Sequence, residues 1–168
     1  MKRGYLLTLS LLSVFLSDSP GLAETPAANL VDELRANNVQ QLVLTNACYR
    51  CDLVGVDLSE IHLIGADLRG ATLAGANLSW SNLEGADLTG ANLTGANLTG
   101  AFLTNASLAR AILDNVNFTQ AQLYYVDVTG ASMENLNLAD ATVLGTPISI
   151  GGREPIGLEE LPPMLNEH

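Results

Sequence analysis

Two cysteines, Cys48 and Cys51, are the residues of this chain whose type and spacing most readily suggest chemistry, since a C-x-x-C pair can act in thiol exchange or bind a metal. A thioredoxin-like role is expected beside a βαβ pattern, and none surrounds this pair. Two cysteines also supply only half of a tetrahedral zinc site. In an oxidising compartment the pair forms a disulfide or stays as two buried thiols, and we favour this structural interpretation.

Other catalytic side chains are scarce. The chain has two histidines, His62 and His168, and the second is the terminal residue. A Ser-His-Asp or Cys-His constellation would therefore have to use His62. We predict that His62 points outward and that both cysteines point inward, so the sequence predicts no enzyme and no cofactor.

A five-residue repeat positions these residues. Every fifth residue from Leu53 to Val143 is apolar, and a second, mostly small apolar series lies two residues earlier, from Cys51 to Ala141. An α-helix would scatter residues five apart around its surface, and one long strand would send alternate ones to opposite faces. Both series are buried if each unit is a short extended segment followed by a turn.

Glycine marks where those turns fall. Every glycine between Leu53 and Thr146 lies two residues after a central apolar position, and glycine adopts the backbone conformations that tight corners require. No proline lies between Pro26 and Pro147, which fits continuous backbone hydrogen bonding between successive coils. The sequence thus predicts an all-β solenoid.

The segment "GADLTGANLTGANLTGAFL" resembles the pentapeptide-repeat family, whose consensus is A(D/N)LXX, and the resemblance covers residues 51–145. It implies a right-handed quadrilateral β-helix with four units per coil. Residues 51–145 would then form about five coils, stacked about 4.8 Å apart. Exported cyanobacterial members look similar at the start of the repeats, where a short helix leads into C-x-x-C-D-L.

Residues before and after the repeats predict three further segments. Lys2 and Arg3 precede an apolar run that ends in the small residues Gly21 and Ala23, which is typical of a signal peptide over residues 1–23. Residues 24–50 are predicted to form an N-terminal helical cap, and residues 146–168 a C-terminal extension. We therefore expect export to the periplasm, the thylakoid lumen or the medium, with no membrane span after cleavage.

The cap is expected to hold one or two short helices across residues 29–44 that cover the first coil. Leu30, Val31 and Leu34 have helical spacing, and Asn38 is placed to cap a second helix.

The charge of the chain limits its partners. The formal net charge is −11, and nucleic acids and anionic membranes are bound through cationic surfaces. Direct nucleic-acid binding is therefore excluded. Some acidic pentapeptide-repeat rods resemble a DNA duplex and occupy topoisomerase clefts, so the resemblance leaves an acidic DNA-mimic inhibitor as an alternative. The expected signal peptide argues against it, because those targets are cytosolic.

One outward column of the solenoid carries carboxylates. Asp67 and Asp87 fall twenty residues apart and would lie about 5 Å from each other on neighbouring coils. Stacked carboxylates can recruit a cation, so a weak Ca²⁺ site is conceivable there. Arg69 lies on the same side, and we favour a solvated charged surface with no metal.

An outward aromatic group is the best candidate for binding. Phe102 occupies a position usually given to Asp or Asn, Tyr124 and Tyr125 follow one coil later, and Trp80 lies at the neighbouring corner. Exposed aromatic clusters often mark protein interfaces. The sequence therefore predicts a non-catalytic exported interaction protein, with a partner or self-association through this group. Alternatives are cover by the C-terminal segment, neutral drift, or a thiol redox protein that uses the C-x-x-C pair.

Overall fold

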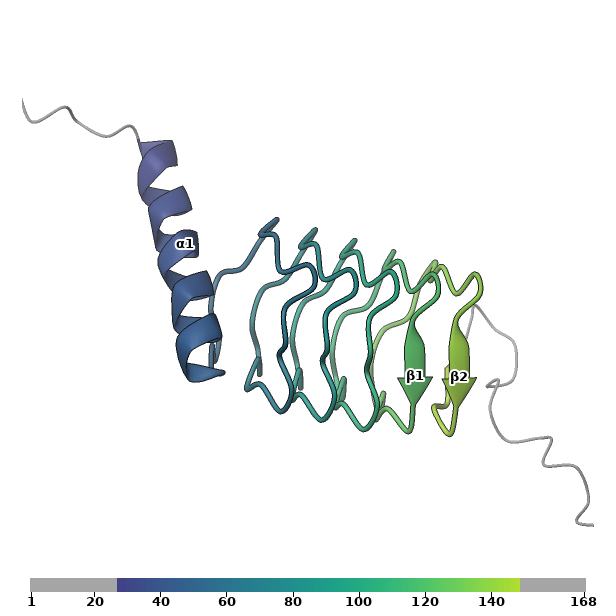
Figure 1. The fold of residues 1–168 in the computed structure, drawn as a ribbon. Helices are drawn as coiled ribbons and strands as arrows, with labels where there is room; N and C mark the ends of the chain where they lie inside the picture. The colour runs from purple at the N-terminus through teal and green to yellow at the C-terminus, as the bar shows by residue number, and fades with distance from the viewer. Residues whose placement is uncertain (1–26, 149–168) are drawn as a thin grey trace, which may run out of the picture.

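The computed structural model describes residues 27–148 (Figure 1). Its elements are helix α1 (Ala27–Thr45) and two short strands, β1 (Gln122–Tyr124) and β2 (Thr142–Leu144). Between α1 and β2 the backbone winds as a regular tube of stacked coils. The expected signal peptide and all but the first three residues of the expected C-terminal extension lie outside the described residues.

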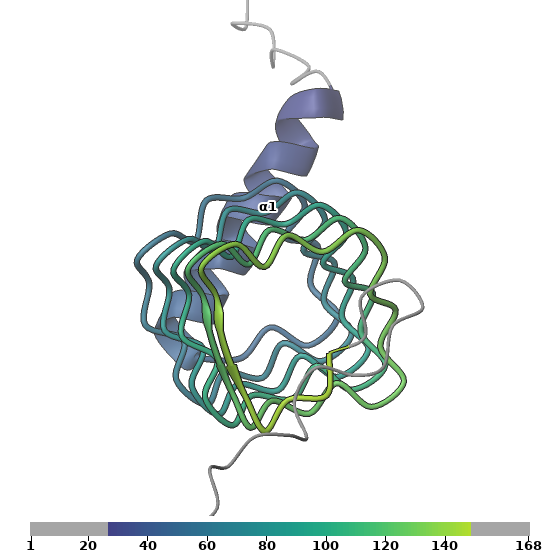
Figure 2. The same ribbon diagram turned by 90° about the vertical axis from the view of Figure 1, so that its right-hand side faces the viewer.

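Parallel backbone pairing at a spacing of twenty residues builds the tube. β1 and β2 pair in this register, with Gln122 opposite Thr142. Isolated parallel bridges repeat the pattern along the rest of the tube, and they fall into four ladders. The ladders begin at Ala47, Asp52, Asp57 and His62. Each coil of twenty residues therefore has four sides, which are visible when the tube is seen end-on (Figure 2).

The tube is filled by the two apolar series. The central leucines from Leu53 to Leu103 are fully buried, and the residues of the second series are buried beside them from Ala66 to Val126. Ser81 interrupts the small series, and its hydroxyl donates a hydrogen bond to the Leu78 carbonyl oxygen at 2.7 Å. The inward orientation predicted from the five-residue period is therefore confirmed.

Each corner of the tube is a residue with a positive φ. The glycines of the repeats have φ values between 64° and 70°, as the sequence predicted for the turn positions. Non-glycine residues adopt the same conformation at the other corners, among them Trp80 (φ 59°) and Tyr125 (φ 54°). Where an Asp or Asn precedes the central apolar residue, its side chain supports the next corner. In Asn97, for example, Oδ1 accepts hydrogen bonds from the Thr99 N–H at 3.1 Å and the Thr99 hydroxyl at 2.6 Å.

A single helix closes the N-terminal end. The prediction of one or two helices across residues 29–44 is confirmed as one helix, whereas the prediction of Asn38 as an N-cap is wrong. Asn38 lies inside α1, and its side-chain amide donates to the Asp52 carbonyl oxygen at 3.0 Å. Leu42 is buried in the core. Leu30 and Leu34 are exposed, because the first turns of α1 extend beyond the outline of the tube (Figure 2). Only the second half of α1 therefore covers the first coil.

The inward pattern continues to the last described residue. Thr146 and Ile148 are both buried. The Thr146 hydroxyl accepts a hydrogen bond from the Val126 N–H and donates one to the Leu123 carbonyl oxygen, both at 2.9 Å. Met133 and Leu138 in the last coil are only half-buried. In residues 27–148, no helix is both long and apolar enough to cross a membrane.

Candidate functional site

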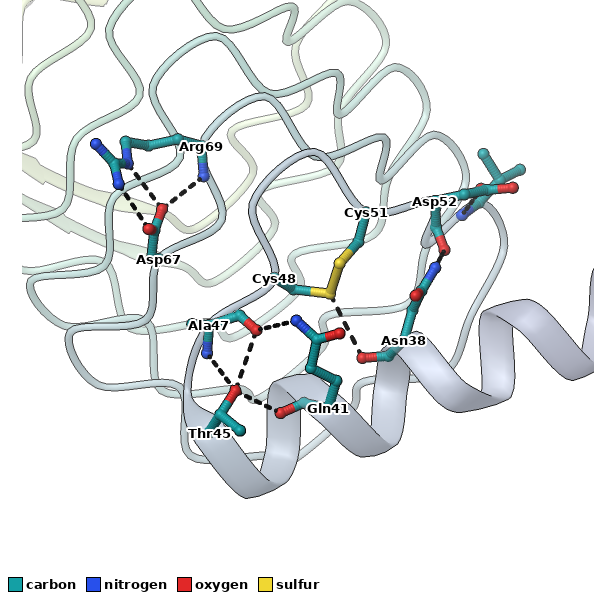
Figure 3. Close-up of a disulfide and its surroundings, with 10 residues drawn as sticks. Asn38, Gln41, Thr45, Ala47, Cys48, Cys51, Asp52, Asp67 and Arg69 are labelled. Carbon is teal, nitrogen blue, oxygen red and sulfur yellow. Dashed lines mark hydrogen bonds and ion pairs between the residues drawn. A yellow bond between two sulfur atoms is a disulfide. The ribbon is translucent and has the colours of Figure 1, made fainter.

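The structure joins Cys48 and Cys51 in a disulfide across the first corner of the tube (Figure 3). Their Cα atoms lie 5.3 Å apart. Cys48 is fully buried and Cys51 is half-buried. The Cys48 sulfur lies 3.4 Å from the Asn38 carbonyl oxygen of α1, so the disulfide lies between the helix and the first coil. Burial of Cys48 shields its sulfur from attack by a second thiol.

Polar contacts attach α1 to the same coil. The Gln41 side-chain amide donates to the Ala47 carbonyl oxygen at 3.1 Å, and the Ala47 N–H donates to the Thr45 hydroxyl oxygen at 3.3 Å. Arg35 on α1 forms an ion pair with Asp52 at 3.2 Å. The surroundings of the disulfide thus consist of contacts that hold the cap in place.

The Asp67 and Asp87 column is bridged by an arginine. Arg69 donates two side-chain hydrogen bonds to Asp67, from Nε at 2.8 Å and from a terminal nitrogen at 2.7 Å. The same Nε lies 3.7 Å from the Asp87 carboxylate. Residues 27–148 contain no group of three or more His, Cys, Asp or Glu side chains arranged to hold a metal ion. The column is therefore an ion-pair cluster on the surface of the tube, in which the Arg69 guanidinium lies beside the carboxylates of Asp67 and Asp87.

Arg69 also changes the titration of this cluster. Its side-chain hydrogen bonds hold the pKa of the Asp67 carboxyl below the ordinary value of 3.8. In turn, the hydrogen bonds and charge of Asp67 raise the pKa of the Arg69 guanidinium. Both shifts favour the ion pair over the neutral forms.

Acid is expected to weaken the fold partly through Asp67. A carboxylate whose pKa is lowered by folding stabilises the folded state above its unfolded pKa, and that contribution is lost as the pH falls through the folded pKa. Asp67→Asn should therefore show a smaller fall in Tm than the unmodified protein between about pH 5 and about pH 2. Thermal unfolding followed by circular dichroism measures this, with Asp140→Asn at an exposed corner as the control. Equal acid sensitivity of all three proteins would contradict the assignment.

One side of the tube carries four aromatic residues. Trp80, Phe102 and Tyr125 are 51%, 37% and 61% exposed, while Tyr124 in β1 is half-buried. Phe102 lies in the ladder that runs from His62 to β2, between Asn82 and Gln122. Trp80 and Tyr125 are the corners at the two edges of this side. We call the side the aromatic wall, and its large apolar members are Ile64, Trp80, Phe102, Tyr124, Tyr125 and Leu144.

Glycines on the next coil seat two of the rings. A Cβ atom at Gly100 would collide with the Trp80 indole, and one at Gly145 would collide with the Tyr125 ring. Each ring therefore lies along the tube, against the glycine at the equivalent corner of the next coil. Trp80 and Tyr125 thus pack against the next coil and still remain exposed.

His62 provides no catalytic constellation with the cysteines. Its side chain is exposed on the aromatic wall, whereas Cys48 is buried at the disulfide. His62 thus lies on the aromatic wall, whereas the disulfide of Cys48 and Cys51 lies between α1 and the first coil.

A basic corner was missed by the sequence analysis. Arg50 and Arg110 are corner residues of one column, and with Tyr49 and Arg69 they line a shallow cleft of about 340 Å³. The available signal was their separation by a multiple of twenty residues, together with the glycines at positions 70, 90 and 130 between and beyond them.

Comparisons with known proteins identify the repeat. The family model for pentapeptide repeats matches eight copies over residues 51–90 and 86–123. No curated protein matches the chain. A solved pentapeptide repeat protein from the Arabidopsis thaliana thylakoid lumen is 31% identical, with 67% of this chain and 73% of that chain covered and a TM-score of 0.40.

Two further solved structures are similar to the chain. The pentapeptide repeat protein Rfr23 from the cyanobacterium Cyanothece 51142 is 26% identical, with 70% of this chain and 95% of that chain covered and a TM-score of 0.37. QnrB1, a plasmid-mediated fluoroquinolone resistance protein, is 18% identical, with 63% and 58% covered and a TM-score of 0.41. The repeat sequence, the family model and the identity to the Arabidopsis protein lead to one conclusion: the chain belongs to the pentapeptide-repeat family, and its fold is a right-handed β-helical solenoid.

Proposed function

We propose that this protein is a non-catalytic, exported interaction scaffold that presents the aromatic wall to a protein partner. The observation that carries the proposal is the gathering of Trp80, Phe102 and Tyr125 on one side of the tube with more than a third of each side chain exposed. Aromatic residues are enriched where protein interfaces are buried most deeply. Monomeric soluble proteins rarely expose several large apolar side chains in one contiguous patch unless the patch is a binding site.

The architecture that we infer is a quadrilateral rod of about five coils with α1 as its cap. The inter-coil hydrogen bonds support its rigidity, for example from the Asn97 N–H to the Ala76 carbonyl oxygen at 2.9 Å and from the Leu98 N–H to the Asn117 carbonyl oxygen at 2.8 Å. Asparagine side chains add an external ladder, in which Asn117 donates to Asn97 at 3.4 Å. A surface that is already ordered binds at a lower entropic cost than a flexible one.

Export is the second part of the proposal. The residues at positions 1–23 are typical of a signal peptide. Disulfides persist mainly in oxidising compartments, and Cys48 and Cys51 are joined in one. The similar Arabidopsis protein comes from the thylakoid lumen, which supports a lumenal or other exported location for this chain as well.

The charge distribution favours an interaction scaffold over a DNA mimic. A duplex presents a continuous negative surface, and this chain has a net charge of −11. However, Arg50, Arg69 and Arg110 gather along one cleft and interrupt that surface. A redox role is likewise disfavoured, because the Cys48 sulfur is buried beneath α1.

Charge placed on the wall tests the proposal. Phe102→Asp introduces a carboxylate in the middle of the aromatic wall. Ile112→Asp is the matched control, because Ile112 is 41% exposed and occupies the same position of its repeat on the opposite side of the tube. Affinity capture from the exported fraction identifies the partner, and titration calorimetry then gives its Kd. Self-association is followed by sedimentation equilibrium.

We expect Phe102→Asp to weaken the partner complex or the self-association by at least about tenfold, because the loss of an anchor residue at the centre of an interface costs about 2 kcal/mol or more and about 1.4 kcal/mol corresponds to a factor of ten in Kd. Ile112→Asp should leave the Kd within about twofold of the unmodified protein. Equal affinity of both variants and the unmodified protein would rule out the aromatic wall as the binding site.

A further inference from the structure

A cleft along one corner of the tube collects most of the positive charge of the described residues. Its walls are Tyr49, Arg50, Arg69, Thr89 and Arg110, and its floor is formed by the glycines at positions 70 and 90. We call these residues the basic corner. The four arginines of residues 27–148 are Arg35 on α1 and these three, so three of the four cationic side chains of the described residues lie here.

Two of the arginines have no carboxylate partner among residues 27–148. Arg69 forms ion pairs with Asp67 and Asp87, whereas neither Arg50 nor Arg110 has a described carboxylate within 4.0 Å. The Arg50 guanidinium lies 5.1 Å from the centre of the Tyr49 ring. Stacking on a ring uses the flat side of a guanidinium and leaves its N–H groups free to bind an anion.

Glycines let both arginines lie along the corner. The Arg50 Cγ atom lies 3.1 Å from the position that a Cβ of Gly70 would take, and the Arg110 Cγ atom lies 3.5 Å from the corresponding position at Gly130. Both side chains therefore follow the corner toward the C-terminal end of the tube. Their charged ends form a line rather than a single point, which suits an extended acidic segment better than a small ion.

The last described residues lie on the side of the tube that ends at this corner. The Thr146 hydroxyl bonds the Val126 N–H, so Thr146 stacks on the column that contains Val126. Four residues after Val126 comes Gly130, which lies under Arg110 in the corner. In the same register Ile148, the last described residue, corresponds to Val128, two positions before the corner of Gly130.

The remaining residues, 149–168, have the complementary charge. They contain Glu154, Glu159, Glu160 and Glu167 against the single cation Arg153. An extended chain of this length spans roughly 60 Å, whereas four coils from Gly130 back to Arg50 span only about 19 Å. The segment is therefore long enough to follow the whole corner.

We propose that the basic corner is the docking site of the acidic C-terminal segment, residues 149–168 of the same chain, whose glutamates pair with Arg50 and Arg110. The site is separate from the aromatic wall, which begins at the neighbouring corner of Tyr125, so docking here leaves the wall open to a partner. This proposal stands independently of the proposed function.

Limited proteolysis of the mature full chain tests the docking. The readout is the rate at which subtilisin removes residues 149–168, followed by mass spectrometry at low and high salt. The test variant is Arg50→Gln/Arg110→Gln. Its control is Asn115→Glu/Gln120→Glu, which makes the same change in net charge at two other corners of positive φ. An unchanged Tm shows that each variant is folded.

We expect Arg50→Gln/Arg110→Gln to be cleaved about tenfold faster than the unmodified protein at low salt, because loss of docking increases the population of the free segment. The control should be cleaved at the unmodified rate, and high salt should remove the difference. Combining Arg50→Glu/Arg110→Glu with Glu159→Arg/Glu160→Arg should restore slow cleavage.

Two results would overturn the proposal. One is equal cleavage of the unmodified protein and Arg50→Gln/Arg110→Gln at low salt. The other is protection that increases with protein concentration, which would assign the corner to the acidic segment of a second copy or to another acidic partner.

Discussion

Replacement of Leu93 by alanine is expected to lower the free energy of unfolding by about 2–5 kcal/mol, and replacement by aspartate should prevent folding. Leu93 is fully buried, and its N–H donates to the Ile112 carbonyl oxygen on the next coil at 2.8 Å. Alanine at this position leaves a cavity in the middle of the tube. An aspartate would place a charge there, away from water and without a cationic partner.

Urea unfolding followed by circular dichroism measures the Leu93→Ala effect. Thr94→Ala, one residue along and outward, is the control. Thr94 is half-buried and its hydroxyl donates to Asn92 Oδ1 at 2.7 Å, so its loss should cost only about 0.5–1.5 kcal/mol. Similar losses for the two variants would show that Leu93 does not face the core.

Gly100→Ala is the second change with a large expected effect. Gly100 has a φ of 67°, which costs a side-chain-bearing residue about 1 kcal/mol, and a Cβ there would collide with the Trp80 ring. Displacement of the ring should add about 1–3 kcal/mol. Gly95→Ala is the matched control, because Gly95 has a φ of 66° and no atom within 4 Å of the added Cβ.

A double-mutant cycle separates backbone strain from the collision. In the Trp80→Ala background, Gly100→Ala should cost no more than Gly95→Ala, because the ring that blocks the Cβ is gone. Chemical unfolding of the four proteins gives the coupling energy. A coupling energy near zero would show that Trp80 does not lie on Gly100.

The five-residue period was enough to predict the tube and where its corners fall, but not how the side chains at those corners pack. Burial of Leu93 and its equivalents follows from the spacing alone, since only a chain that turns once per unit can point all of them inward. The register placed Trp80 at a corner, where it adopts, as Tyr125 does, the left-handed conformation that isolated bulky residues rarely adopt. Here the hydrogen bonds to the neighbouring coils determine the corner, and the side chain accepts it.

The ends of the rod were harder to predict than its middle. Leu30 and Leu34 have helical spacing, and the sequence alone indicated that they cover the first coil. In the structure only the second half of α1, with Leu42, reaches the core. Where a helix crosses a tube depends on the direction of the chain at Asn46, which has a φ of 56° and no counterpart in the five-residue pattern.

The candidate sites differ in the same way. The aromatic wall could be predicted, since Phe102 and Tyr125 interrupt positions normally given to polar residues or glycine. The basic corner was not predicted, because Arg50 and Arg110 come together only through the coil length and the way each side chain lies over a glycine of the next coil. Similarly, the pairing of Arg69 with both Asp67 and Asp87 depends on rotamers that no spacing specifies.

The central claim is that one continuous four-sided tube turns both apolar series inward and leaves the side chains between them on its outer surface. Nuclear Overhauser contacts between residues twenty apart test this claim most directly. In the mature protein, the backbone protons of Asn77 should contact those of Asn97, and those of Asn97 should contact Asn117, with equivalent contacts along the other three ladders. Helical i, i+3 contacts through residues 51–145, or inter-coil contacts at any other spacing, would contradict this account.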